Sequence, residues 1–199
     1  MNDSVNVEAR GLSDETLEQL RVAIIALLPD LRGFARFLVR DRAVADDLVQ
    51  DALVRALSAL EQFQAGTNLK AWLFTIVRNT FYEAMRRRKR ETTVMQEQRP
   101  ADEAERPAVE GRAAVRELQS LIWTLPPLLR EALILVGAQE MTYDEAALVC
   151  GVPVGTIKAR VSRGRTALAD AMRRAEGDVE NLHTGADTYL SGVSEQSHK

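Results

Sequence analysis

Apolar residues recur at helical spacing along most of the chain, and no stretch of useful length shows the alternation that predicts a half-buried strand. In the first half, the pattern predicts helices over about 16–28, 30–40, 45–60 and 69–90. The first of these is expected to end near Pro29, because proline removes a backbone donor from a helix interior.

A second helical block is expected from about residue 112 to residue 175. One helix is predicted over 112–124, and the next begins at the Pro-Pro pair that follows, since proline is tolerated in a first helical turn. Two further helices are predicted over 142–150 and 154–173.

The segments outside these blocks have a different composition. Residues 91–111 combine proline and glutamine with many carboxylates and lose the apolar periodicity, which is typical of an interdomain linker. Residues 1–15 are predicted to be a disordered leader, and residues 176–199 a flexible tail. The expected fold class is all-α, with two small helical domains at 16–90 and 112–175 joined by a flexible linker.

Composition agrees with a packed protein of modest size. The chain has 199 residues, of which 46% are hydrophobic, and this is enough for one ordinary domain or two small ones. Its single cysteine, Cys150, excludes an internal disulfide. No apolar run approaches the roughly 20 residues that span a bilayer, and no secretory leader precedes the first helix, so a cytoplasmic protein without a membrane partner is expected.

The segment 143–161 has the spacing of a DNA-binding helix-turn-helix. Ala147 is small enough for two helices to cross closely, and Gly151 falls at the turn, where glycine adopts a positive φ freely. Ile157 and Val161 are expected to pack the second helix back against the first.

The second helix of this segment is expected to expose a polar and basic face. Its first turns would meet base edges in the major groove, and its later cations would contact phosphates. The predicted DNA-contacting residues are Thr156, Lys158, Arg160, Arg163 and Arg165. A plain helical hairpin with a solvated basic face is the alternative, but six cations against the one carboxylate of Asp170 over 155–174 favour DNA binding.

The helix predicted over 69–90 carries seven cations, one carboxylate and four aromatic rings. Such a surface suits strand-separated DNA, in which bases stack on rings and cations follow the backbone. Trp72 and Phe81 lie on the apolar stripe and are predicted to be core, whereas either role stays open for Phe74 and Tyr82. The five consecutive cations at its C-terminal end exceed what is needed to balance a helix dipole.

Polar groups near this helix suggest further contacts with DNA. Arg78 and Asn79 are candidates for contacts with a duplex or with an extruded base, and the loop from Gln64 to Asn68 offers amide groups to a flipped base. A separate acidic set occupies the early part of the helix predicted over 45–60, opposite its apolar stripe, where carboxylates complement the helix dipole. Its members are Asp46, Asp47, Gln50 and Asp51.

Two groups of motifs, taken together, resemble the extracytoplasmic-function (ECF) sigma factors. The sequences ADDLVQD at 45–51 and TNLKAWLFTIVRN at 67–79 resemble region two of that family. LPP at 125–127, YDEAA at 143–147 and GTIKARV at 155–161 resemble region four. The amino-acid sequences of both groups of motifs are most similar to those of the EcfG-type general stress response group.

The resemblance implies an alternative RNA polymerase sigma factor that binds core polymerase, recognises the minus-35 and minus-10 promoter elements and starts transcription of stress-response genes. Residues 16–90 would form the region 2 domain and residues 112–175 the region 4 domain. The acidic set would bind the β′ clamp of the polymerase, and region 4 would also touch the β flap. Thr156, Lys158, Arg160, Arg163 and Arg165 would contact the minus-35 element. Gln64, Asn68, Lys70, Arg78, Asn79, Tyr82 and Arg86 would contact the minus-10 element.

The same resemblance implies an anti-sigma partner of the NepR kind, which a sigma-mimicking response regulator would release. Two positions depart from the usual pattern: Ala159 stands where serine is common, and Asp51 stands where glutamate is common. The first departure bears on promoter preference, and the second shortens the carboxylate's reach while keeping its charge.

Catalysis is not expected. The two histidines, His183 and His198, lie in the polar tail, and no residues have metal-ligand spacing or form a glycine-rich phosphate loop. We therefore expect no catalytic residue, metal, cofactor or small-molecule substrate.

Two alternatives stay open at this point. A one-component repressor would sense a ligand through the first block and bind DNA without polymerase. A sigma-like decoy would bind only an anti-sigma protein, although the cations kept at 86–90 and 160–165 argue against it. The sequence does not determine how the blocks sit in the free protein; an acidic linker could lie against their basic faces in a compact state.

Overall fold

The structure is a computed structural model that describes residues 13–64, 66–94 and 113–194. Within these ranges the regular elements are all helical, which confirms the predicted all-α class. The predicted linker lies almost entirely outside the described residues, as does most of the predicted leader.

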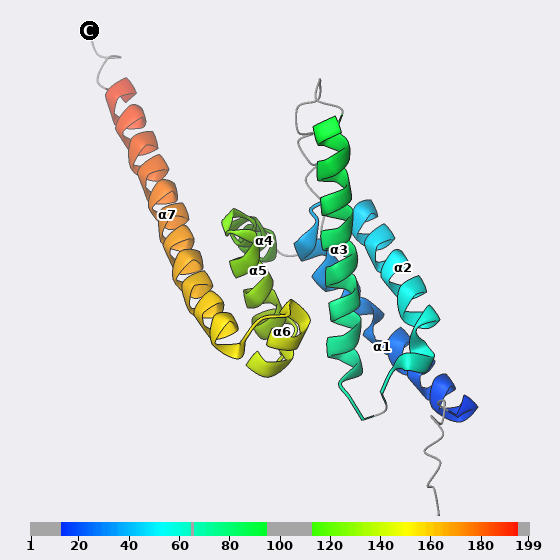
Figure 1. Cartoon of the computed structure of the whole chain (residues 1–199). Helices are drawn as coiled ribbons and strands as arrows, with labels where there is room; N and C mark the ends of the chain where they lie inside the picture. Colours follow the sequence, from blue (N-terminus) through cyan, green and yellow to red (C-terminus); the bar gives the residue numbers. More distant parts are fainter. Residues whose placement is uncertain (1–12, 65, 95–112, 195–199) are drawn as a thin grey trace, which may run out of the picture.

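The first block consists of α1 (Asp14–Leu38), α2 (Arg42–Ser58), a short 3₁₀ turn η1 (Leu60–Gln62) and α3 (Leu69–Val94). The three long helices pack against one another, and α3 lies between α2 and the second block, whereas α1 crosses behind α3 (Figure 1).

The second block consists of α4 (Ala113–Thr124), α5 (Pro127–Leu133), the π-helical turn η2 (Ile134–Ala138), α6 (Tyr143–Cys150) and α7 (Val154–Ser194). Helices α4, α5 and α6 all pack on α7, so this long helix is the scaffold of the block (Figure 1).

One hydrophobic cluster runs through both blocks. The rings of Phe34 and Phe74 meet inside the first block with centroids 5.0 Å apart, and Leu135 and Ile157 are fully buried in the second. Helix α3 packs on α6, and α1 contacts α5. The two blocks are therefore in direct contact.

Two predicted boundaries in the first block are wrong. Pro29 lies inside α1, so the expected pair of helices is one helix. Buried residues on both sides of the proline, including Ile24, Leu31 and Phe34, hold the helix against the core, and this packing outweighs one lost hydrogen bond. Helix α2 begins at Arg42 with Asp41 as its N-cap, so the acidic set lies beyond the first turn and its position is not explained by the dipole.

Two other helices are longer than expected. Helix α3 extends to Val94, four residues beyond the predicted end. The sequence pattern predicts that the last helix ends near residue 173, before a loose tail, but α7 continues to Ser194. No proline follows Pro153 in the sequence, so each later residue can donate its backbone N–H.

The helix-turn-helix geometry agrees with the sequence in detail. Thr142 and Glu145 form a reciprocal capping box at the start of α6, and Gly151 ends α6 with a φ of 63°. Ile157 and Val161 are buried, and Ala147 is almost completely buried between the helices. The predicted turn and its packing are confirmed.

Gly164 marks the close crossing of α7 and α5. A Cβ added there would lie 2.9 Å from Cγ and Cδ1 of Leu133, whereas nothing lies within 4 Å of a Cβ added at Gly155. We predict that Gly164→Ala destabilises the chain by about 1–2 kcal/mol, because overpacking exceeds the gain in helix propensity. Gly155→Ala is the matched control and should be neutral or stabilising by up to about 1 kcal/mol. Urea unfolding of both variants tests the crossing, and equal stabilities would contradict it.

Candidate nucleic-acid and polymerase interface

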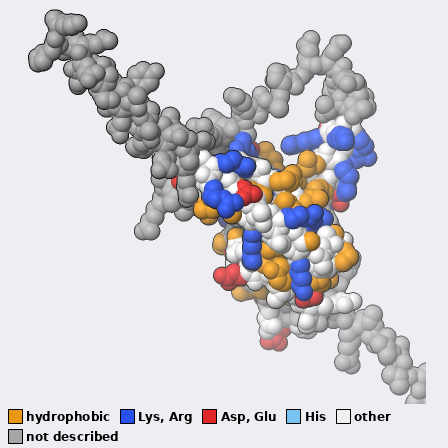
Figure 2. Space-filling model, turned by 90° about the vertical axis from the view of Figure 1, so that its left-hand side faces the viewer, with side chains coloured by type: hydrophobic (Ala, Val, Ile, Leu, Met, Phe, Trp, Pro, Cys, Tyr) orange, Lys and Arg blue, Asp and Glu red, His pale blue; other side chains and the backbone are white. Residues whose placement is uncertain are grey.

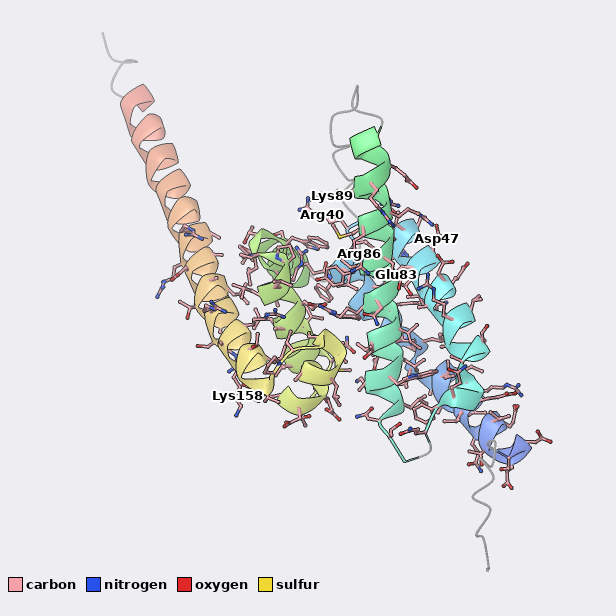
Figure 3. The ribbon with its side chains drawn as sticks, viewed as in Figure 1. Arg40, Asp47, Glu83, Arg86, Lys89 and Lys158 are labelled. Atoms are coloured by element: carbon pink, nitrogen blue, oxygen red, sulfur yellow. The ribbon has the colours of Figure 1, made fainter. Side chains whose placement is uncertain are left out.

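Most of the predicted minus-35 residues lie on the surface at the beginning of α7. Lys158, Arg163 and Arg165 are exposed, and Thr156 is half-buried. The Lys158 ammonium lies 5.9 Å from the centroid of the Tyr143 ring, and Arg163 Nε donates to the carbonyl of Ala159 at 3.3 Å. Figure 3 shows Lys158 in the first turns of α7, and Figure 2 shows Lys and Arg side chains in several clusters on the face viewed there.

Arg160 differs from the other cations of this helix. The sequence predicts an exposed side chain, but Arg160 is half-buried, and its Nη1 atom is buried without a hydrogen-bond partner among the described residues. The reason is helical spacing: Arg160 follows the buried Ile157 by three residues and precedes the buried Gly164 by four. It therefore lies beside the apolar stripe.

Two predicted minus-10 residues on α3 meet one carboxylate of α5. Arg78 Nε donates to Oε1 of Glu131 at 2.7 Å, and the Tyr82 hydroxyl lies 3.5 Å from Oε2. The Arg78 guanidinium also lies 4.6 Å from the Tyr82 ring centroid. The side chain of Glu131 is only 1% exposed and that of Arg78 is 16% exposed, so this ion pair joins the two blocks inside the protein.

The surroundings fix the protonation states of both α3 side chains. Burial lowers the pKa of Arg78, but the charge and hydrogen bond of Glu131 outweigh burial, and the pKa lies above its usual value. Burial, followed by the Glu131 charge, raises the pKa of Tyr82. At neutral pH, Arg78 is therefore a cation and Tyr82 is a neutral hydroxyl.

Asn68 and Lys70, at the start of α3, also contact the second block. The Asn68 side-chain oxygen caps α3 through the N–H of Ala71 at 3.0 Å, and its amide donates to Glu145 of α6. Lys70 Nζ donates to the backbone carbonyl of Gln139 at 2.9 Å. The same ammonium pairs with Asp30 of α1 at 3.0 Å.

The remaining members of the predicted minus-10 set are open to solvent. Gln64, Asn79 and Arg86 are exposed. The two aromatic residues left open by the sequence differ: Phe74 is completely buried in the core, whereas Tyr82 is half-buried beside Glu131. The core prediction for Trp72 and Phe81 is confirmed, because both pack partly buried against the hydrophobic cluster.

The acidic set forms one side of α2. Asp47, Gln50 and Asp51 are exposed, while Asp46 is half-buried and lies 3.9 Å from Arg32 of α1. A groove runs between α2 and α3, and carboxylates of α2 and guanidinium groups of α3 line it. Figure 3 shows Asp47 at the same end of the first block as Arg86 and Lys89. The groove lining includes Asp47, Asp51, Arg86 and Arg87.

Sequence reasoning assigned no role to several residues that join the blocks. Glu131 stands out in the sequence only as a carboxylate within the apolar stripe of 128–136. Trp123 of α4 lies under the guanidinium of Arg130 at 3.8 Å and within 5.5 Å of Arg40, which follows α1. For Glu131 and Trp123, the sequence offers one sign of a contact between the blocks: a charged or aromatic side chain next to a predicted core position.

None of the helices is long and apolar enough to cross a membrane in the part of the chain that the structure describes. Over the same residues, no group of three or more His, Cys, Asp or Glu side chains is arranged to hold a metal ion.

Comparison with known proteins matches the two blocks to two different family models. The model of sigma-70 region 2 matches residues 24–91, and the model of sigma-70 region 4 matches residues 115–168. The ECF RNA polymerase sigma factor EcfG of Rhodopseudomonas palustris is 43% identical over 152 residues, which cover 76% of this chain and 84% of that protein. This chain belongs to the ECF RNA polymerase sigma factor family.

Other relatives of this sigma factor agree. The ECF RNA polymerase sigma factor SigC of Mycobacterium tuberculosis is 36% identical over 155 residues, covering 76% of this chain and 83% of that protein. The solved structure of the sigma factor RpoE of Bartonella quintana, in complex with the anti-sigma factor NepR, is 40% identical. It matches with a TM-score of 0.70 and covers 78% of this chain and 98% of that one.

Cys150 gives a test of the packing of this sigma factor. Burial, followed by the charge of Glu131, raises the pKa of the thiol to about 12. At pH 8 we expect the native chain to react with a thiol reagent about a thousandfold more slowly than the chain in urea, because the thiolate is the reactive form. The native rate should still rise between pH 9 and pH 11, where that of the unfolded chain levels off. A native rate that levels off near pH 9 would contradict the buried site.

Proposed function

We propose that this chain is an alternative sigma factor that binds core RNA polymerase through α2 and contacts the minus-10 and minus-35 elements through α3 and α7, starting transcription of stress-response genes. The observation that carries the assignment of roles is the separation of charge: an acidic face on α2 and basic faces on α3 and α7. Binding alone suffices for this role, so we assign no catalytic residue, and polymerase binding implies a cytoplasmic site of action.

The proposed minus-35 contact rests on the helix-turn-helix. The capping box begins α6 and the αL conformation of Gly151 ends it, three residues before α7 begins at Val154. Recognition helices of this motif read base edges from their first turns. Thr156 and Lys158 occupy these turns. Arg163 and Arg165 lie further along and suit phosphates, which set position and affinity. Arg160 completes the proposed set only after its half-buried guanidinium is released.

The proposed minus-10 contact uses the loop before α3 and the length of α3 itself. Gln64, Asn79 and Arg86 are exposed and available to an open DNA strand. Asn68, Lys70, Arg78 and Tyr82 belong to the same set but contact the second block in this structure. Cations and a phenol ring on one helix suit a single strand, because bases stack on rings while the backbone follows the cations.

The proposed polymerase contact uses the exposed carboxylates of α2. Asp47 and Asp51 are one helical turn apart, with Gln50 between them and Asp46 beside them, on the side opposite the buried residues of the helix. Such a face would meet basic side chains of the β′ clamp through charge-assisted hydrogen bonds. Region 4 is proposed to meet the β flap.

The stress-response role and the regulator are inferred from relatives. The relative from R. palustris is an EcfG, and the similar structure from B. quintana holds a sigma factor with the anti-sigma factor NepR. We infer that a NepR-like anti-sigma protein binds this chain too.

Transcription in vitro tests the proposal. With purified core polymerase and a stress-type promoter, the wild-type chain should give promoter-specific transcripts that core polymerase alone does not give. The double variant Asp47→Arg, Asp51→Arg should lose both transcripts and co-purification with core, because like charges then face each other. Glu18→Arg reverses an exposed charge on α1 and should retain both activities. If the wild-type chain gives no promoter-specific transcripts, the proposed sigma-factor function is rejected. If the double variant still binds core polymerase, the proposed α2 surface is rejected.

A second experiment tests the recognition helix. Lys158→Ala should weaken minus-35 binding by the holoenzyme by about 1–3 kcal/mol if Lys158 reads a base. Arg174→Ala removes another exposed cation about four turns further along α7 and should change binding much less. Footprint titrations of the two holoenzymes make the comparison. If the two variants lose the same amount of binding free energy, Lys158 does not read a base.

A further inference from the structure

The groove between α2 and α3 has the size of a small-molecule site. Its larger cavity has a volume of about 390 Å³, and ligand pockets in proteins commonly measure about 300–1,000 Å³. Both helices line this cavity, and its charged lining residues are Asp51, Arg55, Glu83, Arg86, Arg87 and Arg90. Figure 3 shows Glu83 and Arg86 at the end of the first block where Asp47 also lies. We call this cavity the arginine pocket.

The charge of the arginine pocket suits an anion. Arg55 and Glu83 form an ion pair with nitrogen and oxygen 2.5 Å apart, so their charges balance. The three remaining arginines then outnumber the one remaining carboxylate of the lining, that of Asp51. Arg87 also lies 3.8 Å from Glu91, but this contact is exposed and therefore weak. Guanidinium groups bind phosphate oxygens through pairs of parallel hydrogen bonds, so a ligand with several phosphates fits this lining.

A buried hydroxyl of the lining lacks the bond that its position in a helix offers. Thr80 is 4% exposed, and its Oγ1 atom has no hydrogen-bond partner among the described residues. Threonine in a helix can donate to the carbonyl four residues earlier, as Thr75 does to Ala71 at 2.8 Å. Thr80 makes no such bond, although it lines the groove. Its hydroxyl can therefore donate to a phosphate oxygen in the arginine pocket.

A second, smaller cavity continues the arginine pocket and is lined mostly by apolar side chains. The two cavities share Asp51, Thr80, Ala84 and Arg87. The larger apolar residues of the second cavity are Val39, Val44, Leu48, Phe81 and Met85. A ligand with its phosphates in the arginine pocket would thus place an attached flat ring against apolar side chains, which is the usual lining of a ligand site.

We propose that the groove between α2 and α3 binds a nucleoside di- or triphosphate, with the phosphates in the arginine pocket and the base in the adjoining apolar cavity. The nucleotide is a bound ligand and is not converted. The lining includes Asp51 of the proposed polymerase set and Arg86 of the proposed minus-10 set, so the ligand would lie between these two surfaces. Binding itself does not depend on either role, because it is measured on the free chain.

Calorimetric titration of the full chain with ATP and with GTP tests the site. At least one of the two should bind at one molecule per chain, and at least about tenfold more tightly than tripolyphosphate or the matching nucleoside, because each of these fills only one part of the groove. Absence of binding by both nucleotides at millimolar concentration overturns the proposal. Equal affinity for tripolyphosphate also overturns it, because the apolar cavity then contributes nothing.

Two substitutions locate the bound nucleotide. Thr80→Val removes the hydroxyl and keeps the shape of the side chain, and Arg90→Ala removes an exposed guanidinium. Each should weaken nucleotide binding at least about tenfold, because a hydrogen bond to a charged phosphate is lost. A far-ultraviolet dichroism melt should show Thr80→Val to be no less stable than the wild type, because the hydroxyl that it removes has no partner among the described residues.

Arg21→Ala is the matched control. Arg21 is an exposed arginine of α1 that lies 3.2 Å from a carboxylate, Glu18, and it lines neither cavity. This variant should keep the wild-type affinity for the nucleotide. If Thr80→Val and Arg90→Ala keep it too, any nucleotide site lies elsewhere and the proposal is rejected.

DNA is the alternative occupant of the arginine pocket. If neither nucleotide binds and Thr80→Val weakens binding of a single-stranded minus-10 oligonucleotide, the groove holds DNA phosphates and the proposal is overturned. The wild type would still give promoter-specific transcripts with core polymerase in that case. Failure of this inference is therefore distinguishable from failure of the proposed function.

Discussion

The arrangement of the two blocks depends on a buried ion pair between Arg78 and Glu131. Removing one partner of such a pair leaves a charge without compensation and typically costs about 3–5 kcal/mol, whereas the intact pair adds little net stability. A pair of this kind specifies which surfaces meet. Here it brings α3 against the second block, and the contacts of Asn68 and Lys70 follow from that placement.

The same interface explains how an acidic protein can carry two DNA surfaces. The net charge is −3, yet cations dominate α3 and the first half of α7. Uncontrolled binding to any DNA would follow if these cations were always free, because phosphate contacts are independent of sequence. Four residues of the proposed minus-10 set, Asn68, Lys70, Arg78 and Tyr82, contact the second block, which limits this binding. The carboxylates of α2 and the cations Lys158, Arg163 and Arg165 of α7 remain exposed.

Local features were predictable from the sequence, and features that join distant segments were not. The turn at Gly151 and the buried Ile157 follow from short-range spacing and a residue suited to positive φ. The continuation of α1 through Pro29 depends on tertiary packing, which overrides local propensity. The contact of Arg78 with Glu131 joins residues 53 positions apart, so periodicity carries no signal for it. The burial of Arg160 follows from helical spacing beside Ile157, but helical spacing gives no sign that its buried Nη1 atom lacks a hydrogen-bond partner among the described residues.

The crossing at Gly164 bears on how this protein can diverge. With Leu133 so close that a single added carbon would meet it, α7 has little freedom to tilt or turn on α5. Under the proposed role of α7, changes in promoter preference would be easier to acquire at outward positions such as Lys158 and Ala159 than through a new docking angle. Exposed side chains could then be exchanged, and the recognised sequence with them, while the packing of α7 on α5 stays the same.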